Sequence, residues 1–161
     1  LVGNRYHPDK FIQIANSIET TVIRVIAGWQ DYYSAQYGSV ASIHFRPDSI
    51  EREALNVDTT TLADRMVVLY TGEPRNSGIN NWEITKAHID GDKEIFEIFE
   101  GIRDGAIKLR SALLAGDWNL VGEILKAAHP QRKRLSPNIT TPRMDELIDI
   151  ALANGAIAPK V

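Results

Sequence analysis

The stretch DKEIFEIFEGIRDGAIKLRSALLA, residues 92–115, carries apolar side chains three or four residues apart over its whole length. This spacing is typical of an amphipathic helix that buries one face. The apolar stripe consists of Ile95, Ile98, Phe99, Ile102, Ala106, Leu109, Leu113 and Leu114. The stretch therefore predicts a long helix.

Helical patterns also lie on both sides of this stretch. A helix is expected at about 80–90. After Ala115-Gly116, Asp117 is a candidate N-cap for a helix that begins at Trp118. Residues 137–142 are rich in loop formers, and the last helix is expected at 143–154, where Gly155 stops it.

The strand candidates lie in the N-terminal half. A helix is expected at 8–26, and a polar and aromatic segment then leads to a short apolar run at 40–45. Residues 50–57 alternate charged and apolar side chains, as a half-exposed strand does. Residues 66–70, Met-Val-Val-Leu-Tyr, give the strongest signal for a buried strand. Strands followed by four or five helices predict an α+β fold with helices packed on a small, mostly antiparallel sheet.

Composition excludes several classes of function. The 161 residues are 43% hydrophobic and 24% charged, which predicts a single globular core rather than two independent domains. A net charge of -3 argues against nucleic-acid partners. The absence of cysteine excludes disulfides, a thiolate nucleophile and a cysteine zinc site. No apolar run reaches the roughly 18 residues of a membrane span.

The segment Gly28-Trp29-Gln30-Asp31-Tyr32-Tyr33 places an acid beside an amide and aromatic rings. An Asp in this setting can orient a hydroxyl group and accept its proton, as phosphoryl transfer to an alcohol requires. Asp31 is therefore the candidate base, although an Asp between aromatic residues is more often a helix cap or a hydrogen-bonded loop acid. Trp29 is a candidate for stacking on a sugar.

A loop at residues 71–78 follows the strongest strand candidate. Arg75 in this loop could bind a phosphate or sugar hydroxyls, with Ser77 as a neutral partner, or it could form an ordinary ion pair. The basic run Gln131-Arg132-Lys133-Arg134 reads first as a solvated helix C-terminus and second as an anion site. Trp82 and Trp118 are expected in the core.

The sequence does not contain the common ligand motifs. Its four histidines are at least 37 residues apart, so no metal site is assigned to protein ligands. Neither a Gly-x-x-x-x-Gly-Lys-Ser/Thr loop nor a Gly-x-Gly-x-x-Gly fingerprint occurs.

Three separated elements carry a family resemblance. They are residues 27–40, with Gly-Trp-Gln-Asp followed by a Tyr- and Gly-rich segment; residues 69–78, Leu-Tyr-Thr-Gly-Glu-Pro-Arg-Asn-Ser-Gly; and residues 135–147. Read together, they resemble the GHMP kinases, the superfamily of galactokinase, homoserine kinase, mevalonate kinase and phosphomevalonate kinase. The likeness is closest to the sugar-kinase branch that includes heptose 7-phosphate kinases.

The resemblance implies a cytoplasmic enzyme that uses ATP and Mg²⁺ to phosphorylate a sugar hydroxyl, most simply C1 of a heptose 7-phosphate. It makes Asp31 the catalytic base or alkoxide stabiliser. Substrate contacts are implied for Trp29, Gln30, Tyr33, Arg75 and Ser77. The expected partner is a sugar or sugar phosphate, and a homodimer is possible on this view.

The resemblance also divides the chain. Residues 1–58 look like the end of the N-terminal kinase domain, and 59–161 like a ferredoxin-like C-terminal domain that stops before its last glycine-rich motif. The family's phosphate loop is absent, so the chain is expected to be an internal segment without an ATP site of its own. Two alternatives stay open: a non-catalytic sugar-binding or regulatory module, and an inert fragment.

Overall fold

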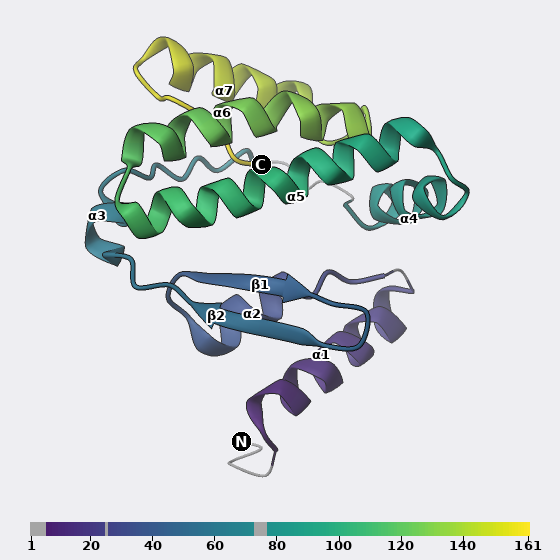
Figure 1. The fold of residues 1–161 in the computed structure, drawn as a ribbon. Coiled ribbons are helices and arrows are strands. Elements are labelled where there is room, and N and C mark those ends of the chain that lie inside the picture. The colour runs from purple at the N-terminus through teal and green to yellow at the C-terminus, as the bar shows by residue number, and fades with distance from the viewer. Residues whose placement is uncertain (1–5, 25, 73–76) are drawn as a thin grey trace. The chain divides into compact units, whose positions relative to one another are not determined.

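The computed structural model describes residues 6–24, 26–72 and 77–161 (Figure 1). The chain divides into two compact units, Leu1–Thr60 and Thr61–Val161. The expectation of a single core is therefore wrong, because each unit gathers its own buried side chains. The helix-rich chain with its two-stranded antiparallel sheet confirms the α+β class.

The first unit holds two helices and a hairpin. Helix α1 (Pro8–Ile23) has Pro8 in its first turn, and Arg24 ends it in the left-handed region at φ 57°. After α2 (Gln30–Tyr37), strands β1 (Ala41–Phe45) and β2 (Ile50–Ala54) pair antiparallel. The two predicted strands are confirmed, whereas α2 occupies a segment for which the sequence predicted no element.

In its described residues the second unit contains helices joined by loops, and no strand. After the short α3 (Thr59–Ala63) come α4 (Ser77–Ile89), α5 (Lys93–Ala115), α6 (Trp118–Leu135) and α7 (Pro142–Ala153). Figure 1 shows α5 and α6 running side by side. Gly116 at φ 67° turns the chain between them, and Asp117 caps α6 by accepting a hydrogen bond from the Leu120 N–H at 3.0 Å. These helices and this cap confirm the sequence prediction.

The buried strand predicted at residues 66–70 is not present. This segment has no regular secondary structure, and Val67, Val68 and Tyr70 are 85%, 89% and 91% exposed. An apolar run becomes a strand only where a sheet edge accepts its backbone hydrogen bonds, and β1 and β2 pair only with each other in the described residues. The apolar pattern of residues 66–70 is that of a strand, but no strand in the described part of the chain pairs with them.

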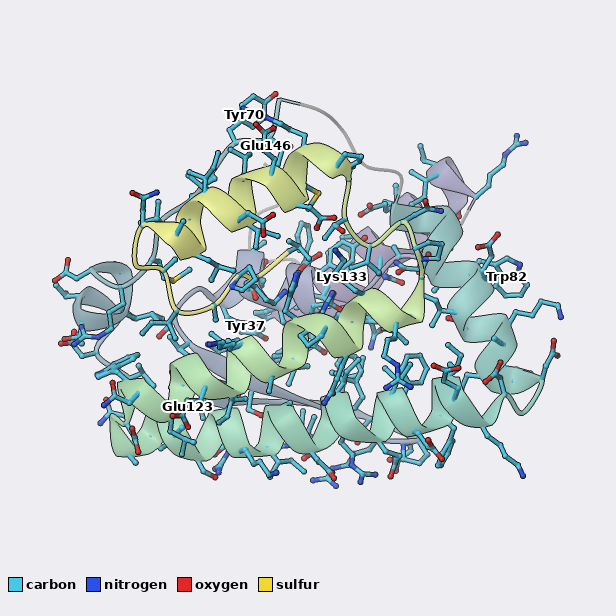
Figure 2. All side chains as sticks on the ribbon, turned by 90° about the horizontal axis from the view of Figure 1, so that it is seen from above. Tyr37, Tyr70, Trp82, Glu123, Lys133 and Glu146 are labelled. Atoms are coloured by element: carbon cyan, nitrogen blue, oxygen red, sulfur yellow. The ribbon has the colours of Figure 1, made fainter. Side chains whose placement is uncertain are left out.

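The two tryptophans expected in the core also differ from that expectation. Trp82 on α4 is 49% exposed and projects outward (Figure 2). Trp118 at the start of α6 is half-buried, and the Arg65 guanidinium lies over its ring at 5.0 Å. A helix that packs along one narrow stripe leaves wide side chains at its margin exposed, as Trp82 illustrates.

We expect the buried amide of Asn16 to stabilise the first unit. Asn16 is only 7% exposed, and its Nδ2 donates to the Ala27 carbonyl at 3.2 Å. Asn16→Ala leaves this carbonyl without its partner and should lower the free energy of unfolding by about 1–3 kcal/mol. Urea unfolding followed by NMR resonances of this unit measures the loss.

The matched control is Ser17→Ala, one residue along the same helix. Ser17 is exposed, and its hydroxyl donates a hydrogen bond to the Gln13 carbonyl of the same helix at 2.8 Å. Removing this hydroxyl should change the free energy of unfolding by less than about 0.5 kcal/mol. Equal losses in the two variants would show that the Asn16 bond is not specially stabilising.

Candidate functional site

The entry into α2 carries the acidic element that the sequence singled out. The hydrogen bond from Asn16 fixes Ala27, and the Gln30 side chain folds back over Gly28, where a Cβ would lie 3.0 Å from Gln30 Nε2. Trp29 is half-buried just before the helix. Asp31 follows in the first turn of α2 and is exposed. A carboxylate here is accessible to a ligand, and the helix N-terminus favours its negative charge.

A pocket lies on another side of α2. It has a volume of about 370 Å³ and is lined by Asp9 of α1, Tyr33 and Tyr37 of α2, and Ile50, Glu51 and Arg52 of β2. The two tyrosine rings are stacked, with centroids 6.2 Å apart and planes 18° from parallel. The Arg52 guanidinium covers the Tyr37 ring at 4.9 Å. We call this group of six residues the tyrosine pocket.

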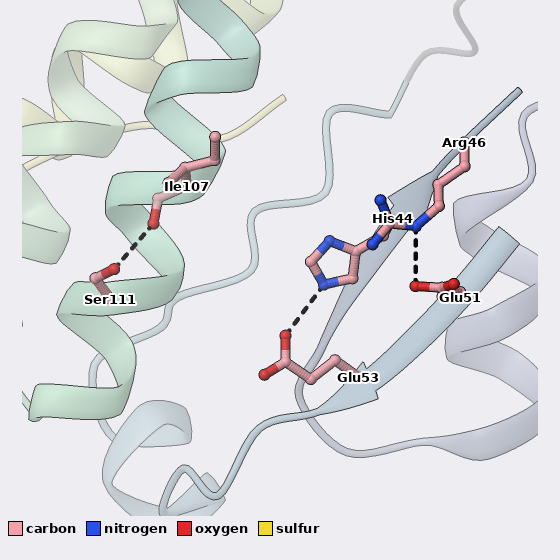
Figure 3. A network of polar contacts seen from close by, with 6 residues as sticks. All are labelled: His44, Arg46, Glu51, Glu53, Ile107 and Ser111. Carbon is pink, nitrogen blue, oxygen red and sulfur yellow. Dashed lines mark hydrogen bonds and ion pairs between the residues drawn. The ribbon is translucent and has the colours of Figure 1, made fainter.

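Hydrogen bonds hold the polar groups of the tyrosine pocket. The Tyr37 hydroxyl donates to Asp9 Oδ1 at 2.7 Å, and Arg52 Nη2 donates to the Gly38 carbonyl at 3.0 Å. Glu51 Oε2 accepts from Arg46 Nε at 3.0 Å (Figure 3). The same view shows His44 Nε2 and Glu53 Oε2 at 3.1 Å, a second link between β1 and β2. The pocket is thus held in shape by three elements of one unit.

These contacts change the acidity of the tyrosines. The bond to Asp9, with a smaller contribution from burial, raises the pKa of Tyr37 to about 12. Burial raises the pKa of Tyr33. A hydrogen bond to Glu19 raises the pKa of Tyr32 to about 12. All three phenols are therefore neutral hydrogen-bonding groups at physiological pH.

The structure brings some of the expected site residues together and separates others. Trp29, Gln30 and Asp31 are consecutive at the start of α2. Tyr33 lies two residues after Asp31, which is about 200° around a helix, and it lines the tyrosine pocket while Asp31 does not. Arg75 lies outside the described residues. Ser77 begins α4, and its side chain is also outside what the structure describes.

Sequence reasoning missed most of the tyrosine pocket. Asp9, Glu51 and Arg52 come from segments far from Tyr37 in the chain, so no local motif joins them. One signal was present: Tyr33 and Tyr37 have the spacing of neighbours on a helix face. That signal becomes visible only once residues 30–37 are taken as helical.

The basic run at the end of α6 behaves as a solvated helix C-terminus. Arg132, Lys133 and Arg134 lie in its last turn. Lys133 Nζ pairs with Asp145 of α7 at 2.8 Å and lowers the pKa of that carboxyl group. Arg134 pairs with Glu94 of α5 at 2.9 Å. These ion pairs link α6 to its neighbours, and nothing in them indicates an anion site.

The described residues do not fit an ATP–Mg²⁺ site. Among them, no group of three or more His, Asp or Glu side chains could hold a metal ion. The sequence also lacks a glycine-rich loop of the kind whose backbone N–H groups cradle phosphates. Nor does any helix in the described ranges combine the length and apolar character needed to cross a bilayer.

Comparison with known proteins finds that part of the chain is similar to a GHMP kinase family model and that nearly the whole chain is similar to a sugar-phosphate kinase. Residues 109–161 match the family model described as "GHMP kinases C terminal". Over 152 residues the chain is 25% identical to D-glycero-alpha-D-manno-heptose 7-phosphate kinase of Campylobacter jejuni subsp. jejuni serotype O:2. The match covers 92% of this chain and 44% of that relative, so the chain spans less than half the length of the kinase it resembles.

The bond between Tyr37 and Asp9 leads to a pH prediction. Because the folded protein holds the Tyr37 proton more tightly than the unfolded chain, the bond's stabilisation is complete below pH 10. It disappears as the pH rises from about 10 through about 12. Asp9→Asn should return the pKa of Tyr37 toward 10 and remove this pH dependence.

A tyrosinate absorbance titration measures the change, and Tyr37→Phe identifies which ionisation belongs to Tyr37. Should Asp9→Asn leave that ionisation in place, the Asp9 carboxylate is not the cause of the raised pKa.

Proposed function

We propose that this chain works within an ATP-dependent sugar kinase that phosphorylates a heptose 7-phosphate or a related sugar at C1. The observation that carries the proposal is the match over 92% of this chain to a heptose 7-phosphate kinase, joined by the family match at residues 109–161. The family generally uses ATP and Mg²⁺, which we propose as cofactors of the whole protein. We further propose a cytoplasmic reaction.

The role proposed for Asp31 follows from its position. Its carboxylate is exposed in the first turn of α2, beside the half-buried Trp29 ring and the Gln30 amide. In the proposed reaction, Asp31 accepts the proton of the sugar hydroxyl as that oxygen becomes the nucleophile. Trp29 packs against the sugar and Gln30 orients its hydroxyl groups. The Gln30 amide lies over Gly28, where an added Cβ would be 3.0 Å from Nε2.

Asp31→Asn in the full-length enzyme should lower kcat by at least ~100-fold, because the amide cannot accept the hydroxyl proton. Steady-state kinetics with a heptose 7-phosphate measures the loss, and circular dichroism verifies the fold. Asp48→Asn is the matched control: Asp48 is an exposed aspartate in the turn between β1 and β2, and turnover should stay near normal. Near-normal turnover of the Asp31→Asn variant would remove Asp31 from the mechanism. Sugar binding without ATP turnover in the unsubstituted full-length protein would instead favour a non-catalytic module.

Substrate charge can be tested through Arg75. If the Arg75 guanidinium contacts the phosphate of the acceptor, Arg75→Gln should raise KM for a heptose 7-phosphate about tenfold or more. The KM for the same heptose without phosphate should not change. An equal increase for both sugars would assign Arg75 to hydroxyl contacts or to loop structure instead.

A further inference from the structure

The tyrosine pocket is separate from the acidic element that the proposed kinase reaction uses. Its volume of about 370 Å³ is at the small end of the roughly 300–1,000 Å³ range of small-molecule sites. None of Trp29, Gln30 and Asp31 lines it. A ligand in this pocket therefore lies away from the Asp31 carboxylate, on a different side of α2.

The aromatic part of the pocket is ordered by several contacts. Tyr33 is 5% exposed, stacks on Tyr37, and belongs to the same helix one turn away. Tyr37 is 36% exposed, so the part of its ring that Tyr33 and Arg52 leave uncovered is available to a ligand, while the bond to Asp9 fixes the orientation of the ring. The exposed part of a preordered aromatic ring suits the C–H groups of a sugar, because little side-chain entropy is lost on binding.

The polar part of the pocket offers both donors and acceptors. Asp9 uses one oxygen for the Tyr37 hydroxyl, and a carboxylate has room for further hydrogen bonds. Glu51 uses one oxygen for Arg46, and Arg52 uses one nitrogen for the Gly38 carbonyl. A guanidinium has five N–H donors in all. Vicinal hydroxyl groups, each of which donates and accepts, complement this mixture.

The charge of the lining selects among polyhydroxyl ligands. Of the two carboxylates in the lining, Glu51 is paired with Arg46, and Asp9 lies in the same lining as the Arg52 guanidinium. The lining therefore offers a phosphate group no excess of positive charge to offset its desolvation, whereas an uncharged sugar needs none. We propose that the tyrosine pocket is a second saccharide site that binds an uncharged monosaccharide, distinct from the acceptor site of the proposed kinase.

The test uses the full-length protein with tyrosine rings isotopically labelled. The probes are D-mannose, D-glucose, D-galactose and L-fucose, with D-mannose 6-phosphate as the anionic comparison. At least one uncharged sugar should show intermolecular NOEs to the rings of Tyr33 and Tyr37. D-mannose 6-phosphate should bind there at least about tenfold more weakly than D-mannose.

Variants assign the binding to the pocket. Tyr37→Leu removes the ring, and Arg52→Gln removes the charged donor; each should weaken binding about tenfold or more. Tyr37→Phe keeps the ring and loses the bond to Asp9, so it should have an intermediate affinity even if the leucine variant folds poorly. Tyr70→Leu is the matched control, because Tyr70 is 91% exposed and lies outside the pocket.

Three outcomes would overturn the proposal: no ring NOE from any uncharged sugar, affinity unchanged by Tyr37→Leu and Arg52→Gln, or preference for the phosphorylated sugar. Asp31→Asn separates this site from the proposed reaction. It should abolish turnover and leave the ring NOEs intact. Turnover that survives Asp31→Asn counts against the proposed mechanism alone, whereas lost NOEs in that variant count against a separate saccharide site.

Discussion

The arrangement of the first unit depends on one buried hydrogen bond, from the Asn16 side chain to the Ala27 carbonyl. Asn16 lies one turn after Ile12 on the buried face of α1, where a polar side chain is tolerated only if it is satisfied. By holding Ala27, it determines where the chain leaves the α1–α2 connection and starts α2. The direction of α2 then sets which side carries Asp31 and which carries the stacked tyrosines.

Local signals were enough to predict most of the helices. Helices α5 and α6 have long apolar stripes, and Asp117 followed by a helical pattern is a cap that depends only on neighbouring residues. The β1–β2 hairpin is also local, since the paired segments are separated by a short turn. These features need no knowledge of the rest of the fold.

Features that depend on distant partners could not be predicted in this way. Residues 66–70 have the composition of a strand, but only a sheet edge can make them one, and a sequence pattern does not show whether that edge exists. The prediction for helix α2 was wrong in the opposite sense. Its sequence is only weakly amphipathic and does not indicate a helix, but the folded segment is helical and packs against α1. For the same reason Asp31 could be singled out by its local motif, whereas the contact of Asp9 with Tyr37 required the folded chain.

The exposed run Met66–Tyr70 has a consequence for the behaviour of the chain in solution. Five consecutive apolar residues without charge or proline have the composition of a segment that stacks into intermolecular β-sheet. Asp64 and Arg65 directly precede this run, whereas Thr71 and Gly72 separate it from the next charge, Glu73. Arg65 is also held in place, by its bond to the Thr61 carbonyl at 2.9 Å and by its contact with Trp118. The contact with Trp118 at the N-terminus of α6 thus helps to fix the position of Arg65, the cation next to this aggregation-prone stretch.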